Sequence, residues 1–158
     1  MTEPIVPEVR LVHMQVRRLG RGDEDLARDT FAMMASVFDE GAPDLGVAYV
    51  GTLLARTDFW AMVALDGEQV VAGLTAHVLP MTRSPEAELF IYDLAVRADR
   101  QRRGIGRALV LATLARAKEE GLRVAFVPAD EEDAHAIAFY RAIGGHPSAV
   151  TFFTFGDE

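Results

Sequence analysis

Five arginines and two glycines lie within the thirteen residues RADRQRRGIGRAL, from Arg97 to Leu109. Glycines that precede a helix let the backbone approach an anion closely, and the free N–H groups of a first helical turn attract negative charge. Arginine side chains add charge-assisted hydrogen bonds. The stretch therefore indicates an anion-binding loop, and a solvated arginine loop with a glycine hinge is the alternative.

Two common phosphate motifs do not describe this loop. A P-loop needs Gly-x4-Gly-Lys followed by Ser or Thr, and the chain has no such string. A dinucleotide fingerprint needs Gly-x-Gly-x-x-Gly, and Leu109 stands at the position of the third glycine. The residue types thus predict an anion without naming it.

Acidic residues gather elsewhere, in a chain with a formal net charge of -8. Four consecutive acids, Asp130–Asp133, stand where a strand ends and a helix begins. Helix capping explains one or two of them, but four adjacent carboxylates repel one another. Glu88 and Asp93 lie in a stretch of strand-forming residues that leads to the arginine loop. These acids predict a surface that binds a cation. Helix capping and solubility are the alternative explanations for them.

The bulk composition excludes several classes of protein. At 158 residues and 50% hydrophobic content the chain suits one domain over 1–158, with residues 1–8 as a loose N-terminal arm. It has no cysteine, and its four histidines show no metal-ligand spacing, so neither a metal site nor a cysteine nucleophile is expected. The pI of about 5.0 argues against nucleic-acid binding. Without a signal peptide or a membrane-length apolar run, a cytoplasmic location with no membrane contact is expected.

Periodicity and turn residues predict the order β-α-α-β-β-β-α-β-α-β, with successive hairpin strands first and βαβ crossovers later. A mixed, mostly antiparallel α/β sheet flanked by about four helices follows from that order. The expected strands are 9–18, 59–65, 69–79, 88–96, 123–127 and 149–155, and the expected helices are 23–39, 44–57, 104–120 and 132–143.

The sequence LAVRADRQRRGIGRAL resembles motif A of the GCN5-related N-acetyltransferases, whose Gln/Arg-x-x-Gly-x-Gly/Ala pattern is filled here by Gln101 to Gly106. The resemblance implies their α/β (α+β) fold, with acetyl-CoA as cosubstrate and no metal. It implies pyrophosphate contacts from the loop and backbone contacts to the pantetheine from the preceding strand. The cofactor-binding residues expected on this basis are Leu94, Ala95, Val96, Gln101, Arg102, Arg103, Gly104, Ile105, Gly106 and Arg107.

A second resemblance lies in AIAFYRAIGG, which is similar to the late helix of that superfamily and puts Tyr140 at the position of the general acid. Many members have Asn seven residues earlier, where this chain has Asp133. Only one strand is expected after this helix, where two are common.

Longer stretches resemble the type I aminoglycoside 3-N-acetyltransferases, above all AHVLP, IYDLAV and the acids before the tyrosine helix. In that family the acceptor is a cationic antibiotic, acetylated at the 3-amino group of its 2-deoxystreptamine ring. The match assigns acceptor binding to Asp93, Asp130 and Asp133. Glu132 and His135 lie beside Asp133 and are expected to contact the acceptor as well. His135 stands where relatives often have proline. The expected function is resistance to these antibiotics by direct acetyl transfer in a ternary complex.

That mechanism needs a base, because an acidic pocket keeps the acceptor amine protonated. Asp93 is the favoured base because it is nearer, and Glu88 is the more distant second candidate; either could act directly or through water. Tyr140 would protonate the leaving thiolate. A polyamine or peptide amine is an alternative acceptor, and a non-catalytic acyl-CoA sensor is the alternative from another class. The resemblance also allows a homodimer, although no stretch of the sequence marks an interface.

Overall fold

The computed structural model describes residues 14–41 and 44–157, so the arm predicted at residues 1–8 lies outside its described part. The chain divides into two compact units, Met1–Pro128 and Ala129–Glu158. The first unit contains β1 (Met14–Arg18), α1 (Glu24–Val37), α2 (Val47–Leu54), β2 (Phe59–Asp66), β3 (Gln69–Pro80), β4 (Ala87–Val96), a 3-10 turn (Ala98–Arg100), α3 (Ile105–Glu119) and β5 (Ala125–Phe126). The second unit contains α4 (Ala134–Ala142).

The strands form one sheet in the order β1-β2-β3-β4-β5. The first four strands pair antiparallel and β5 pairs parallel to β4, as a strand reached through a helical crossover must. The Asp66-Gly67 turn joins β2 to β3, and Gly67 has a φ of +60°, which a hairpin turn of this kind requires. The predicted mixed, mostly antiparallel α/β fold is confirmed.

Helix α1 covers one face of this sheet, and Gly73 of β3 shows how closely it packs. A Cβ at Gly73 would lie 2.6 Å from the Sδ of Met34 and 2.7 Å from the Cγ2 of Thr30, both on α1. Alternate residues of β2 complete this core layer: Phe59, Ala61, Val63 and Leu65 cluster with Ala27 of α1 and with Val50 and Leu54 of α2.

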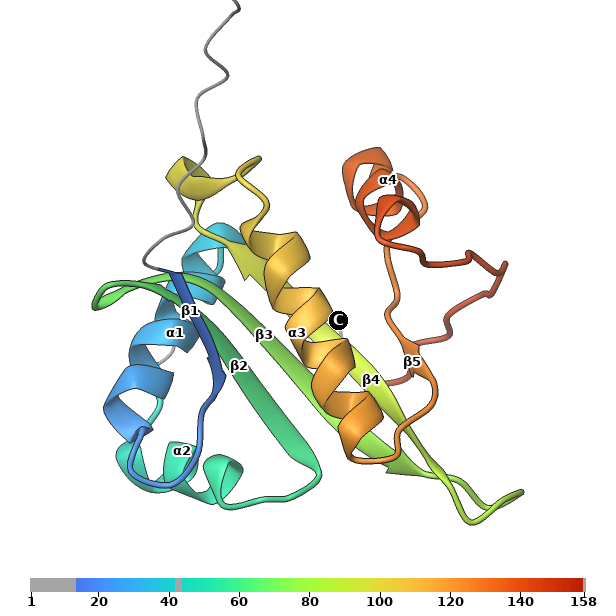
Figure 1. The fold of residues 1–158 in the computed structure, drawn as a ribbon, viewed down its shortest axis with the longest axis horizontal. Coiled ribbons are helices and arrows are strands. Elements are labelled where there is room, and N and C mark those ends of the chain that lie inside the picture. The colour runs from blue at the N-terminus through green and yellow to red at the C-terminus, as the bar shows by residue number, and fades with distance from the viewer. Residues whose placement is uncertain (1–13, 42–43, 158) are drawn as a thin grey trace, which may run out of the picture. The chain divides into compact units, whose positions relative to one another are not determined.

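The opposite face of the sheet packs against α3, which lies in front of the strands in Figure 1, whereas α1 lies behind them. Trp60, Leu74 and Leu89 are fully buried in the sheet, and Leu109 and Thr113 are fully buried in the helix. Because α3 begins directly after the loop that leaves β4, its N-terminus lies at the carboxyl end of a strand, where α/β folds bind ligands.

The last predicted strand, 149–155, is wrong: the structure has no strand in that segment. Its alternating apolar residues suit a strand, but a strand also needs a neighbour for its backbone hydrogen bonds, and within the described residues none pairs with it. The large side chains are 71–93% exposed at Val150, Phe152, Phe153 and Phe155. Among the described helices, none is long and apolar enough to cross a membrane.

Candidate functional site

The loop between β4 and α3 turns its backbone N–H groups outward at the start of the helix. Arg102 has a φ of +62°, a left-handed conformation that non-glycine residues rarely adopt, and the N-cap Gly104 has a φ of +79°. The first helical hydrogen bond is donated by the N–H of Ala108 to the carbonyl of Gly104. In the described part of the chain, no partner is found for the N–H groups of residues 102–107. Such a concave run of free donors fits a phosphate group.

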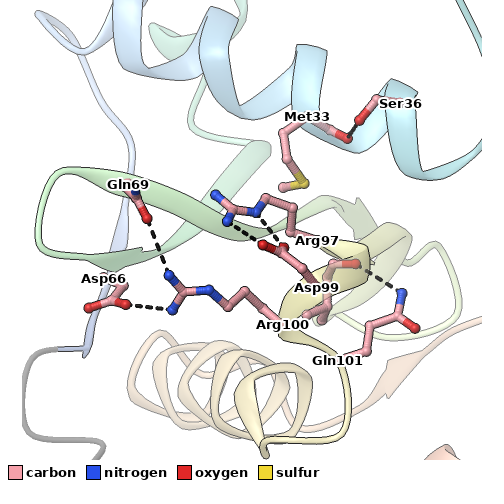
Figure 2. A network of polar contacts seen from close by, with 9 residues as sticks. Met33, Ser36, Asp66, Gln69, Arg97, Asp99, Arg100 and Gln101 are labelled. Carbon is pink, nitrogen blue, oxygen red and sulfur yellow. Dashed lines mark hydrogen bonds and ion pairs between the residues drawn. The ribbon is translucent and has the colours of Figure 1, made fainter.

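The arginines of the loop fall into two groups, and Figure 2 shows the first of them, Arg97 and Arg100. Arg97 makes a bidentate ion pair with Asp99 at 2.6 and 2.7 Å, which lowers the pKa of the Asp99 carboxyl to about 2. Arg100 binds the Asp66 carboxylate and the Gln69 side chain, both at the β2–β3 turn. These two arginines therefore shape the loop.

The other three arginines are available for a ligand. Among the described residues, Arg102, Arg103 and Arg107 have no ion-pair or side-chain hydrogen-bond partner. They flank the free N–H groups, so the loop offers both backbone donors and guanidinium groups to an anion. A pyrophosphate, as in acetyl-CoA, fits this set.

The strand that leads into the loop has one open edge. Leu94, Ala95 and Val96 pair with β3 on one side, whereas β5 pairs only with Leu89 and Phe90 on the other side. Beyond Phe90, none of the strands in the described residues covers this second edge of β4. The side chain of Gln101 donates a 3.1 Å hydrogen bond to the carbonyl of Val96, so one backbone acceptor there is already used. The remaining open edge suits an extended amide-containing chain such as pantetheine.

A bulge in β4 decides which way Asp93 faces. Thr75 lies opposite Asp93 and Ala76 lies opposite Ile91, so Tyr92 is an extra residue without a partner. Because the bulge interrupts the alternation, Asp93 joins the face of the sheet that carries Thr75 and His77.

Glu88 shares this face. It pairs with Leu79, two residues beyond His77 along β3, and residues two apart lie on the same side of a strand. The structure thus brings both candidate bases to one side of the sheet, Asp93 half-buried and Glu88 partly exposed.

The environment of Asp93 raises its pKa. Burial is the main cause, the negative charge of Glu40 raises the pKa further, and His77 acts in the opposite direction. A carboxylate with a raised pKa takes up a proton more readily than an ordinary aspartate does, which suits a general base. Neither Glu40 nor His77 was among the residues expected from the sequence, because only the packing of α1 and β3 around β4 brings them near Asp93.

The acidic residues of the second unit surround the start of α4. Asp133 is the N-cap of the helix, and its carboxylate accepts a 3.0 Å hydrogen bond from the N–H of Ala136. Capping therefore accounts for one of the four acids, as the structural alternative predicted. The side chains of Asp130, Glu132 and His135 are exposed.

Tyr140 lies in the last turn of α4 and is half-buried. Burial raises the pKa of its phenol, and the charge of Asp133 raises it further, so the hydroxyl keeps its proton at neutral pH. The helix ends with Gly144, at a φ of +102°, and with a 2.8 Å hydrogen bond from the N–H of Gly145 to the carbonyl of Tyr140. A Cβ at Gly145 would lie 2.9 Å from that carbonyl oxygen.

In residues 14–41 and 44–157 no group of three or more metal-ligating side chains is found. The groups described above comprise carboxylates, a neutral phenol, guanidinium groups and backbone N–H groups.

Comparison with known proteins identifies the family of the chain and solved structures that resemble it. The model of the acetyltransferase (GNAT) family matches residues 26–144. An aminoglycoside acetyltransferase from an uncultured soil metagenomic sample, solved with trehalose, is 30% identical, with 94% of this chain and 99% of that chain covered and a TM-score of 0.89. The same relative solved with sisomicin gives 30% identity, coverage of 93% and 98%, and a TM-score of 0.88.

A second aminoglycoside acetyltransferase from such a sample is 30% identical, with 91% and 99% covered and a TM-score of 0.84. No curated protein matches the sequence.

Proposed function

Because the chain belongs to the acetyltransferase (GNAT) family, whose members use acetyl-CoA, we propose that it acetylates the 3-amino group of the 2-deoxystreptamine ring of aminoglycosides. The observation that carries the choice of acceptor is the relative solved with the aminoglycoside sisomicin, which is 30% identical over almost the whole chain. The native role that follows is resistance to these antibiotics. The two units would act as one catalytic domain.

The donor side of the proposal uses the loop before α3. The free N–H groups of residues 102–107 and the side chains of Arg102, Arg103 and Arg107 would hold the pyrophosphate. The open edge of Leu94–Val96 would pair with the pantetheine. When bound there, acetyl-CoA supplies the acetyl group as a reactive thioester.

The acceptor side uses the carboxylates. Asp93 and Glu88 share one face of the sheet, and Glu40 adds a negative charge near Asp93. Asp130, Glu132 and Asp133, with His135, would contribute further contacts from the start of α4. A polycation gains from such a set, because each carboxylate can pair with one ammonium group.

The proposed reaction moves three protons: one leaves the acceptor ammonium before the attack, one leaves the same nitrogen for solvent after the C–N bond has formed, and one reaches the CoA thiolate as the C–S bond breaks. Asp93 takes a proton from the acceptor ammonium, directly or through water, so that the neutral amine can attack; Glu88 is the alternative base. A backbone N–H at the bulge polarises the carbonyl under attack. The Tyr140 hydroxyl, held protonated by its raised pKa, gives its proton to the departing thiolate.

The test is an acceptor panel. Purified protein with acetyl-CoA is offered several aminoglycosides, spermidine and peptides with free N-termini, and release of free thiol is followed. Aminoglycosides are expected to give the highest kcat/KM, and NMR of the product should show the acetyl group on the 3-amino nitrogen.

Other outcomes separate the rival functions. Thiol release with spermidine or a peptide alone would contradict the aminoglycoside proposal. Acetylation at another amine would contradict only the position. Binding of acetyl-CoA with no turnover of any acceptor would favour a non-catalytic sensor.

A further inference from the structure

Five aromatic rings form a row across four strands of the sheet. In order, each ring contacts the next: Phe59 and His77 have centroids 5.5 Å apart, His77 and Tyr92 5.6 Å, Tyr92 and Phe90 5.7 Å, and Phe90 and Phe126 5.0 Å. We call this set the aromatic row. It comes from β2, β3, β4 and β5, so it exists only once the sheet has formed.

The aromatic row runs from the core to the surface. Phe59 is only 7% exposed, whereas Phe126 is 42% and Tyr92 is 59% exposed. His77 and Phe90 both meet the Tyr92 ring edge to face, at interplanar angles of 76° and 79°. Contacts with two neighbouring rings limit the rotation of Tyr92, so a large part of its surface is presented in a fixed position.

Tyr92 is also the residue that the β4 bulge inserts, and it stands directly before Asp93. The carboxylates of Glu88 and Asp93 lie on the sheet face that carries Phe90 and His77. An exposed aromatic ring therefore stands among acidic side chains. This combination fits a ligand that has both an apolar face and positive charge.

We propose that Tyr92 is a specificity-determining residue, whose ring packs against the C–H face of an amino-sugar or aminocyclitol ring of the acceptor. The inference rests on the proposed function and names the part of the acceptor that the protein would recognise, the ring carbon skeleton in addition to the ammonium groups. A six-membered ring offers several C–H groups on one face to the electron-rich face of an aromatic ring, and its ammonium groups reach the nearby carboxylates. A linear polyamine satisfies the carboxylates but has no such face.

The test compares Tyr92→Ala and Tyr92→Phe with the wild type, using sisomicin and spermidine as acceptors. Tyr92→Ala is expected to lower kcat/KM for sisomicin about 10-fold, mainly through KM, while kcat/KM for spermidine changes less than about 2-fold. Tyr92→Phe keeps the ring and is expected to keep wild-type values. Tyr49→Ala removes another exposed tyrosine, on α2 and outside the aromatic row, and serves as the control.

Each contrary result has a distinct meaning. Equal losses with both acceptors, or no loss with either, would overturn the role of Tyr92 in specificity. A loss in Tyr92→Phe as large as in Tyr92→Ala would show that the hydroxyl matters and not the packing of the ring. If Tyr92→Ala unfolds at the assay temperature, Tyr92→Leu, which keeps apolar bulk without a ring, should show the same selective loss. A wild type that acetylates spermidine and no aminoglycoside would contradict this inference and the proposed function together.

Discussion

The carboxylate of Asp66 and the guanidinium of Arg100 lie 2.5 Å apart, although 34 residues separate them in the chain. Gln69 accepts a second hydrogen bond from the same guanidinium at 3.2 Å. The pair ties the β2–β3 turn to the loop that precedes α3. An arginine that belongs to the basic stretch is thus used to hold the loop in place.

This division of the arginines predicts different effects for two substitutions. Arg100→Ala should cost about 0.5–1 kcal/mol of stability, the range of a partly exposed ion pair, and should also raise KM for acetyl-CoA. Arg103→Ala should raise KM for acetyl-CoA without changing stability, and this KM should respond less to added salt than that of the wild type. Urea unfolding and KM measured at two ionic strengths check both. Equal stability losses in the two variants would contradict the division.

Removal of the Tyr140 hydroxyl should affect chemistry and not donor binding. Tyr140→Phe is expected to lower kcat by about 10- to 1000-fold, because the departing thiolate loses its proton donor. The dissociation constant for CoA, measured by calorimetry, should stay near the wild-type value. An unchanged kcat would remove Tyr140 from the mechanism.

The pH dependence of kcat/KM should report the base. The raised pKa of Asp93 places the acid-side loss of activity above the ordinary aspartate value of about 3.9. Glu40→Gln removes a charge that raises this pKa, so the acid limb should move to lower pH. His77→Gln removes an opposing influence, so the limb should move to higher pH. If Glu88→Gln abolishes the limb and Glu40→Gln leaves it in place, Glu88 is the base.

The ionised side chain of Asp93 should also lower the stability of the folded protein at neutral pH. Because its pKa is raised in the folded state, the folded protein holds the proton more tightly than the unfolded chain. Stability therefore falls as pH rises from the unfolded pKa through the folded one. Asp93→Asn should raise Tm at pH 7 and not below about pH 3.5, where both states are protonated. Calorimetry at the two pH values checks the sign, and a lower Tm at pH 7 would contradict it.

The packing of Gly73 predicts a steric effect. Gly73→Ala places a Cβ 2.6 Å from the Sδ of Met34 and 2.7 Å from the Cγ2 of Thr30, and overpacking of this kind costs about 1–3 kcal/mol. Met34→Ala should destabilise by leaving a cavity. The double variant should lose less stability than the sum of the two single losses, because the new methyl group gains room. Additive losses in chemical denaturation would show that Met34 does not limit this site.

Local chemistry made the helices and the glycine turn before α3 predictable. Gly104 and Gly144, each with a positive φ, mark the start of α3 and the end of α4, as their positions in the sequence indicated. The Asp66-Gly67 pair marked the hairpin turn in the same way. Each of these features depends on residues within a few positions of one another, which is why sequence patterns reveal them.

Sequence patterns did not predict the structure of the C-terminal segment or the length of the edge strand β5. Residues 149–155 alternate as a strand should, but they form none in the structure, and β5 is limited to Ala125–Phe126. A strand depends on its neighbour as much as on its own residues. Pairing is decided by distant parts of the chain.

By itself, the sequence determined the order of the elements from β1 to α4, the arginines and glycines that could bind an anion, and the acidic residues that could bind a cation. Only the tertiary structure decided which arginines are free, because Asp66 and Gln69 bind Arg100 from another hairpin. It also decided that Asp93 shares a face with His77, since the bulge at Tyr92 depends on pairing between β3 and β4. The physical reason is common to both: ion pairs and strand register join residues that are far apart in sequence, so they exist only in the folded chain.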